Sequence, residues 1–162
     1  MNVMDSLLRN RYILCGVGIA ITYLVFAILQ LNHFVSTLLR GDQYYSYYLT
    51  YVPALFAFFC LYIARGRSFE KLGWSLVFGV VAGYVAGLAA YVFVAFSMGD
   101  GLARLANSAR NLERFLVMLS APFLYLSWAY GALAALSVYL IKKRLARSPR
   151  TEKRESRNVG KG

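Results

Sequence analysis

The stretch Leu72 to Ser97, LGWSLVFGVVAGYVAGLAAYVFVAFS, contains no Asp, Glu, Lys or Arg. A helix needs roughly 20 apolar residues to cross a hydrocarbon layer about 30 Å thick. This stretch is long enough and apolar enough to be such a helix. Three further stretches have the same character, at about 12–31, 47–64 and 115–141.

The composition of the whole chain agrees with this pattern. Of its 162 residues 59% are hydrophobic and 15% are charged, and the mean hydropathy is +0.52. A soluble domain of this size needs fewer apolar residues to form one core. We therefore predict an all-α polytopic membrane protein, a four-helix bundle of two helical hairpins with amphipathic helical segments on its outer side. Residues 1–147 form the transmembrane domain, and 148–162 form a basic, disordered tail.

Lys and Arg in the short flanking segments predict the orientation, because they are enriched on the cytoplasmic side. One side carries Arg9, Arg11, Arg65, Arg67, Lys71 and the tail; the other carries Arg40, Arg104, Arg110 and Arg114. The chain after Ile141 has nine basic and two acidic residues, which is +7 of the net charge of +11. Both termini are predicted to be cytoplasmic, in a bacterial-type inner (plasma) membrane. The tail is interpreted as an anchor on anionic lipid, since it has no aromatic residue to stack on nucleic acid bases.

Three glycines, Gly79, Gly83 and Gly87, recur at every fourth position of the third span. Together they form a groove of bare backbone along one helix face, and small residues let membrane helices approach closely. Two occupants fit this groove: a helix of the same chain, or a second copy in a homo-oligomer. Within the chain the candidate mates are Gly131 and Ala135 of the fourth span, or Gly16 and Ala20 of the first.

The segment QYYSYYLTYVP, Gln43 to Pro53, begins the second span. An aromatic face is predicted by three- and four-residue steps through Tyr44, Tyr48, Tyr51, Leu55, Phe58 and Tyr62, whereas Tyr45 and Tyr47 point elsewhere. Tyr44, Tyr45 and Tyr47 also fit a belt at the outer interface. Tyr48 and Tyr51 lie deeper and are expected to pack against, or bind, something. A kink is expected at each intramembrane proline, Pro53 and Pro122.

Two connections are predicted to be amphipathic helices on the outer side. Residues 33–42 would bury Phe34, Val35, Leu38 and Leu39, and residues 99–116 carry an apolar stripe opposite polar residues. The second segment holds Arg104, Arg110 and Arg114. These arginines either extend to lipid phosphate, as long basic side chains commonly do, or form a site for a phosphate-bearing lipid or an acidic partner.

The residues that catalysis, proton transfer and metal binding require are scarce. The four spans contain no carboxylate, His or basic residue that could serve as a proton relay. The single His33 has no identifiable catalytic partner, and together with Cys15 and Cys60 it makes too few ligands for zinc. We therefore predict that the protein is not an enzyme and has no metal or cofactor.

Two fragments, RYILCGVGIAITYLVFAIL in the first span and VYLIKKR at the end of the last, resemble the GtrA-like proteins. These are small four-helix membrane proteins implicated in moving lipid-linked sugars. The Asn-Phe pair typical of that family is absent here, and Cys60-Leu61 and Val138-Tyr139 stand near the equivalent places. The same four-span plan is shared by colicin-type immunity proteins, and we assign the chain to neither family.

These observations predict a non-enzymatic inner-membrane interaction or assembly protein of an accessory, immunity or defence type. It is expected to be oligomeric and to contact itself or another membrane protein as well as anionic lipid, with no nucleic acid partner. The alternative is a flippase-like facilitator for a phosphate-bearing or lipid-linked glycan substrate.

Overall fold

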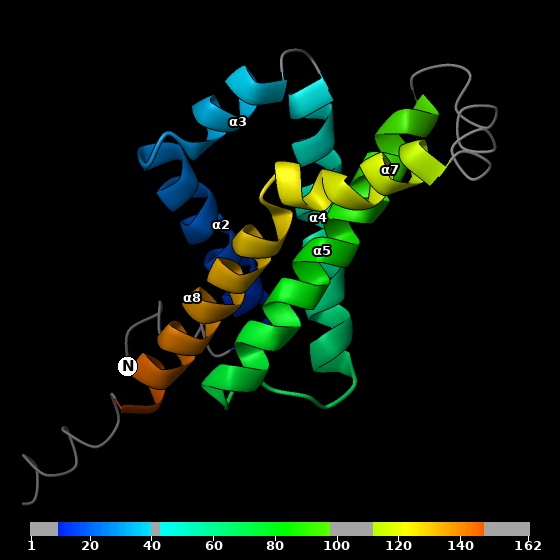
Figure 1. Cartoon of the computed structure of the whole chain (residues 1–162). Coiled ribbons are helices and arrows are strands. Elements are labelled where there is room, and N and C mark those ends of the chain that lie inside the picture. Colours follow the sequence, from blue (N-terminus) through cyan, green and yellow to red (C-terminus); the bar gives the residue numbers. More distant parts are fainter. Residues whose placement is uncertain (1–9, 40–42, 98–111, 148–162) are drawn as a thin grey trace, which may run out of the picture.

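The computed structural model describes residues 10–39, 43–97 and 112–147, and these residues are almost entirely helical (Figure 1). The helices are α2 (Arg11–Ile28), α3 (Leu31–Leu39), α4 (Gln43–Ala64), α5 (Leu72–Ser97), α7 (Leu112–Leu124) and α8 (Ser127–Arg147). Four helical stretches are long and apolar enough to span a membrane: Arg11–Ile28, Ser46–Ala64, Leu72–Ser97 and Phe115–Ala146. The predictions of an all-α fold and of a multi-pass membrane protein are therefore confirmed.

The helices α5 and α8 form the centre of the bundle. They pack against each other in the largest interface between the described helices, and α8 also packs against α2. The helix α4 packs mainly on α5 and more weakly on α2. In Figure 1, α3 and α7 lie at one end of the bundle, and the connection between α4 and α5 lies at the other. We call these the α3/α7 end and the loop end.

The contact between α5 and α8 is made by backbone against backbone. A Cβ atom built on Gly79 would lie 2.5 Å from the carbonyl oxygen of Gly131 and 2.7 Å from the Cβ of Ala135. A Cβ on Gly83 would lie 3.0 Å from the Cα of Gly131. Neither position has room for a side chain, so the glycines allow the two helices to touch. Such close packing holds helices together in lipid, where the hydrophobic effect between them is small.

Two turns divide the helices, one just before the predicted end of the first span and the other inside the predicted fourth span. The turn at Leu29 and Gln30 separates α2 from α3, and the turn at Tyr125 and Leu126 separates α7 from α8. Gln30 and Leu126 both have φ of 54°, a left-handed conformation that costs a non-glycine residue about 1–2 kcal/mol. The two turns also share one hydrogen-bond pattern, in which the left-handed residue accepts from the backbone N–H four positions later.

The two prolines occupy different settings. The helix α4 continues through Pro53, which is exposed. Pro122 is buried in the last turn of α7, and the interruption follows it at Tyr125 and Leu126. A proline frees the carbonyl four residues before it. This effect lies on the N-terminal side of Pro122, so it does not explain the left-handed turn that follows the proline.

The substitution Gly79→Ala tests the backbone contact between α5 and α8. We expect it to lower the free energy of unfolding by about 1–3 kcal/mol, because the added methyl group overlaps the rigid backbone of Gly131. Gly73→Ala is the matched control, since nothing lies within 4 Å of a Cβ there. It should leave stability unchanged or slightly higher. Thermal unfolding in detergent measures both, and equal stability of the two variants would contradict the packing described.

Candidate functional site

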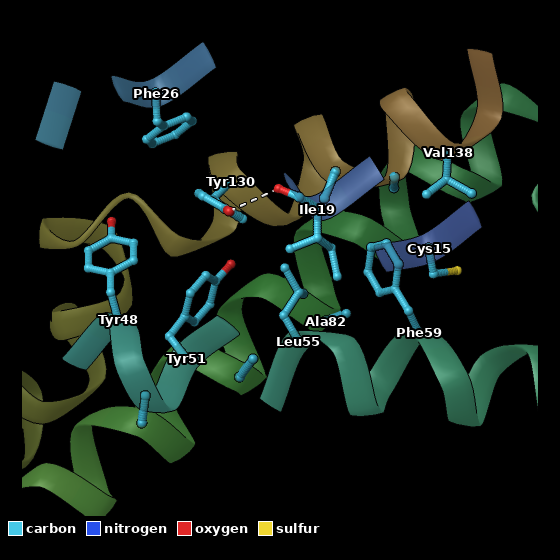
Figure 2. Close-up of a cluster of buried hydrophobic side chains, with 14 of the residues drawn as sticks. Cys15, Ile19, Phe26, Tyr48, Tyr51, Leu55, Phe59, Ala82, Tyr130 and Val138 are labelled. Atoms are coloured by element: carbon cyan, nitrogen blue, oxygen red, sulfur yellow. Dashed lines mark hydrogen bonds between the residues drawn. The ribbon is translucent and has the colours of Figure 1, made fainter. Parts of the chain in front are cut away.

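Five tyrosines meet inside the bundle at the interruption of the fourth span. We call Tyr47, Tyr48, Tyr51, Tyr125 and Tyr130 the tyrosine cluster. The first three come from α4, Tyr125 from the turn, and Tyr130 from α8. All five are buried, and Tyr51 and Tyr130 have no exposed surface. Figure 2 shows Tyr48 and Tyr51 on α4 alongside Tyr130.

Two hydroxyl groups of α4 donate to the backbone at the interruption. The Tyr48 hydroxyl donates to the carbonyl oxygen of Tyr125 at 2.7 Å, and the Tyr51 hydroxyl donates to that of Ser127 at 2.8 Å. The Tyr47 hydroxyl shares a short hydrogen bond with the Ser127 hydroxyl. The turn and the first residue of α8 are therefore attached to α4 at three points.

Tyr130 attaches α8 to α2 in the same way. Its hydroxyl donates to the carbonyl oxygen of Ile19 at 3.1 Å, the dashed line in Figure 2. Its ring also packs on Phe26 of α2, with the centroids 5.0 Å apart. Three tyrosines thus each contribute an apolar ring and a hydrogen-bond donor to the same junction: Tyr48, Tyr51 and Tyr130.

The rings of the cluster also pack on one another. Tyr47 and Tyr125 are stacked, with centroids 3.8 Å apart and an interplanar angle of 15°. Tyr51 meets Tyr130 edge to face, at 5.5 Å and 87°. Aromatic pairs of these kinds add about 0.5–1.5 kcal/mol each beyond the burial of their area.

The position of the interruption explains why it needs these donors. Lys142, the first charged residue of α8, is 17 positions after Tyr125, which is roughly 25 Å along a helix. If Lys142 lies at a membrane surface, Tyr125 is still within an apolar layer about 30 Å thick. Water is absent there, so backbone carbonyls released by the turn need protein donors.

The interior of the described bundle has no unused polar group. Among the described residues, every buried side-chain nitrogen or oxygen atom has a hydrogen-bond partner. The Thr22 hydroxyl, for example, donates to the Gly18 carbonyl at 2.9 Å. Residues 10–39, 43–97 and 112–147 also contain no group of three His, Cys, Asp or Glu that could hold a metal ion. The tyrosine cluster thus holds the structure together, and the hydroxyl groups of Tyr48, Tyr51 and Tyr130 are engaged inside the bundle.

The predicted aromatic face is only partly as expected. Tyr48 and Tyr51 are buried, whereas Phe58 is half-buried and Phe59 has no exposed surface. The prediction that Tyr47 lies in an interface belt, pointing away from this face, is wrong, because Tyr47 is 1% exposed. Tyr47 and Tyr51 are one helical turn apart, so both face α8. The four-residue spacing of Tyr47 and Tyr51 is the sequence signal from which the burial of Tyr47 could have been predicted.

Tyr47 also closes the last part of the glycine groove. A Cβ on Gly87 would lie 2.6 Å from the Tyr47 hydroxyl and 2.7 Å from the Cβ of Ser127. Gly79 and Gly83 face α8, as described above. The groove is therefore filled within one chain, and a second copy could enter it only if α5 separated from α8.

Several predicted residues lie outside the described part of the chain. Arg40, Arg104, Arg110 and the tail 148–162 belong to this group, and the side chains of Leu38, Leu39, Tyr44, Tyr45 and Arg114 are not described. The arginine site therefore stays a prediction. The helix α3 does form in the first connection; Val35 is buried within the protein, whereas 61% of Phe34 is exposed on the surface of the bundle.

The surface carries an apolar groove that the sequence did not predict. It has a volume of about 290 Å³ and is lined by Val80, Val81, Tyr84, Phe123 and Trp128. The Tyr84 hydroxyl donates to the Leu119 carbonyl at 3.0 Å, which ties α5 to α7 beside it. We call it the α5/α7 groove.

No family model, curated protein or solved structure matches this chain. The two fragments that resemble GtrA-like proteins therefore carry no family assignment.

The substitution Tyr51→Phe tests whether the hydroxyl groups support the interruption. It keeps the ring but leaves the Ser127 carbonyl without this donor, and we expect a loss of about 1–2 kcal/mol in the free energy of unfolding. Tyr62→Phe is the control, because the described part of the chain offers the Tyr62 hydroxyl no partner while its ring stacks on Phe78. Unfolding in detergent measures both variants. A loss of similar size in each would show that the hydroxyl bond at Ser127 contributes nothing special.

Proposed function

We propose that this multi-pass membrane protein is a non-enzymatic assembly or accessory protein that acts through helix-helix contacts in the membrane. The observation that carries the proposal is the α5/α7 groove, an apolar hollow on a bundle whose described interior is closed. Two features once expected to meet a partner, the glycine face and the deep tyrosines, are engaged inside the chain. Contacts with another protein must therefore use the outer surface.

The α5/α7 groove suits a protein partner. Three of its five lining residues are aromatic, and Val81, Phe123 and Trp128 are 54%, 56% and 38% exposed. In lipid, helices associate through close van der Waals packing, and a hollow with rigid aromatic walls can accept a row of side chains from another helix. We propose a second copy of this chain as the occupant, in keeping with the oligomeric state predicted from the sequence.

We further propose that the loop end faces the cytoplasm, which places both termini there. The described cationic side chains gather at this end, in Arg11, Arg65, Arg67, Lys71, Lys142, Lys143 and Arg144. Basic residues next to membrane helices favour the cytoplasmic side. The alternative function, movement of a lipid-linked glycan, depends on Arg104, Arg110 and Arg114, and no contact of the described residues favours it.

Photo-crosslinking tests the assembly proposal. A benzophenone amino acid at Phe123, in the groove, should give a covalent dimer of the 18.2 kDa chain after illumination of intact membranes. The same probe at Phe56 is the control, because Phe56 is exposed but lies on the α2 side of α4, near Gly16. Dimers from both positions in equal yield, or from neither, would contradict self-association through the groove. An adduct of another mass at Phe123 alone would identify a different partner protein.

Reporter fusions test the orientation. Green fluorescent protein fused after Gly162 should be fluorescent in a bacterial host, and alkaline phosphatase at the same place should be inactive. Both reporters respond to the side of the membrane on which they fold. Active phosphatase at either terminus would contradict the proposed orientation.

A further inference from the structure

A second hollow opens at the loop end, away from the α5/α7 groove. It has a volume of about 190 Å³ and lies between the start of α2, the 65–71 connection and the last turns of α8. Three cationic residues from these three segments line it: Arg11, Arg67 and Lys142. We call it the loop-end pocket.

The pocket has a charged rim and an apolar floor. Arg11 and Arg67 are exposed, and the Lys142 side chain is 34% exposed. Leu14 and Val138, which also line the pocket, are 6% and 0% exposed. A ligand that fits must therefore be anionic at one end and apolar at the other.

The positive charge of the rim is only partly balanced. Glu70 accepts a hydrogen bond from Lys142 at 3.3 Å and is itself 71% exposed at its side chain. Glu70 also interacts electrostatically with Arg11, but no carboxylate of the described residues forms a salt bridge with the guanidinium group of Arg11 or Arg67. Like charges around one pocket repel each other, and an anion between them removes that repulsion.

A phosphate group matches these cations in chemistry and position. The guanidinium fork forms paired hydrogen bonds with phosphate oxygens, and lysine adds a point charge. The helix α2 also begins at Arg11, so the positive end of its dipole is near the rim. Basic pockets between transmembrane helices at a membrane face bind the head groups of acidic lipids.

We infer that the loop-end pocket binds an anionic phospholipid. Its phosphate contacts Arg11, Arg67 and Lys142, and the adjoining glycerol and acyl carbons lie against Leu14 and Val138. This site is separate from the arginine site predicted around Arg114, since α7 lies at the opposite end of the bundle. It is also independent of the proposed self-association, because it shares no residue with the α5/α7 groove.

Native mass spectrometry of the full chain in detergent tests the inference. Phosphatidylglycerol should remain bound to the folded protein, and phosphatidylcholine with the same acyl chains should dissociate. The double variant Arg11→Gln/Arg67→Gln should bind phosphatidylglycerol at least about tenfold more weakly, because it loses two charge-assisted interactions. Arg65→Gln/Lys71→Gln removes the same charge from the same end outside the pocket, and it should change affinity less than about twofold.

Three results would overturn the inference. Equal weakening in the two double variants would mean that general surface charge attracts the lipid. Equal binding of the two lipids would remove the role of the anionic head group. Complete displacement of phosphatidylglycerol by a molar excess of inorganic phosphate would make the pocket a site for the free anion. The single variant Arg67→Gln, at an exposed position in a connection, provides a further test if the first double variant does not fold, and it should still bind phosphatidylglycerol more weakly than the unaltered chain.

Discussion

Backbone carbonyl groups released in a layer without water need donors from the protein, and this requirement organises the bundle. The fourth span is interrupted at Tyr125 and Leu126, and hydroxyl groups of α4 donate to the carbonyls beside the interruption. The same rings fill the space between α4 and α8. The left-handed turn thus becomes tolerable because α4 supplies both the hydrogen bonds and the packing around it.

The interruption and the glycine face depend on each other at Ser127. The hydroxyl of Ser127 bonds that of Tyr47, its carbonyl accepts from Tyr51, and its Cβ lies against Gly87. A side chain on Gly83 or Gly87 would push α5 away from the point where α8 begins. Three helices therefore meet at one small residue, which has no exposed surface. The helix α7, which precedes Ser127 in the chain, packs against α5. The α5/α7 groove lies at this contact.

The sequence predicts the spans well and the turn poorly, for physical reasons. The length of the four uncharged stretches is enough to predict helices that can cross a membrane, and the spacing of the glycines indicates a close backbone contact. The deep position of Tyr48 and Tyr51 was also predicted from helical spacing. Their partners are backbone carbonyls, which no residue type marks in a sequence. Tyr47 was misassigned because its position near a helix start is typical of an interface belt, whereas its burial depends on the interruption that brings Tyr125 and Ser127 against it.

The loop-end pocket could not be predicted for a related reason. The pocket's three cationic residues are far apart in the sequence: Arg11, Arg67 and Lys142. Read from the sequence alone, each one indicates only the orientation of the chain in the membrane. They converge because α8 lies beside α2 and the 65–71 connection returns beneath both. At the α3/α7 end, Tyr130 already ties α8 to α2 through the Ile19 carbonyl, but no tyrosine of the cluster reaches the loop end. A phospholipid bound there would bridge α2 and α8 at the end where the cluster does not, so lipid and tyrosines would hold the same pair of helices from opposite ends.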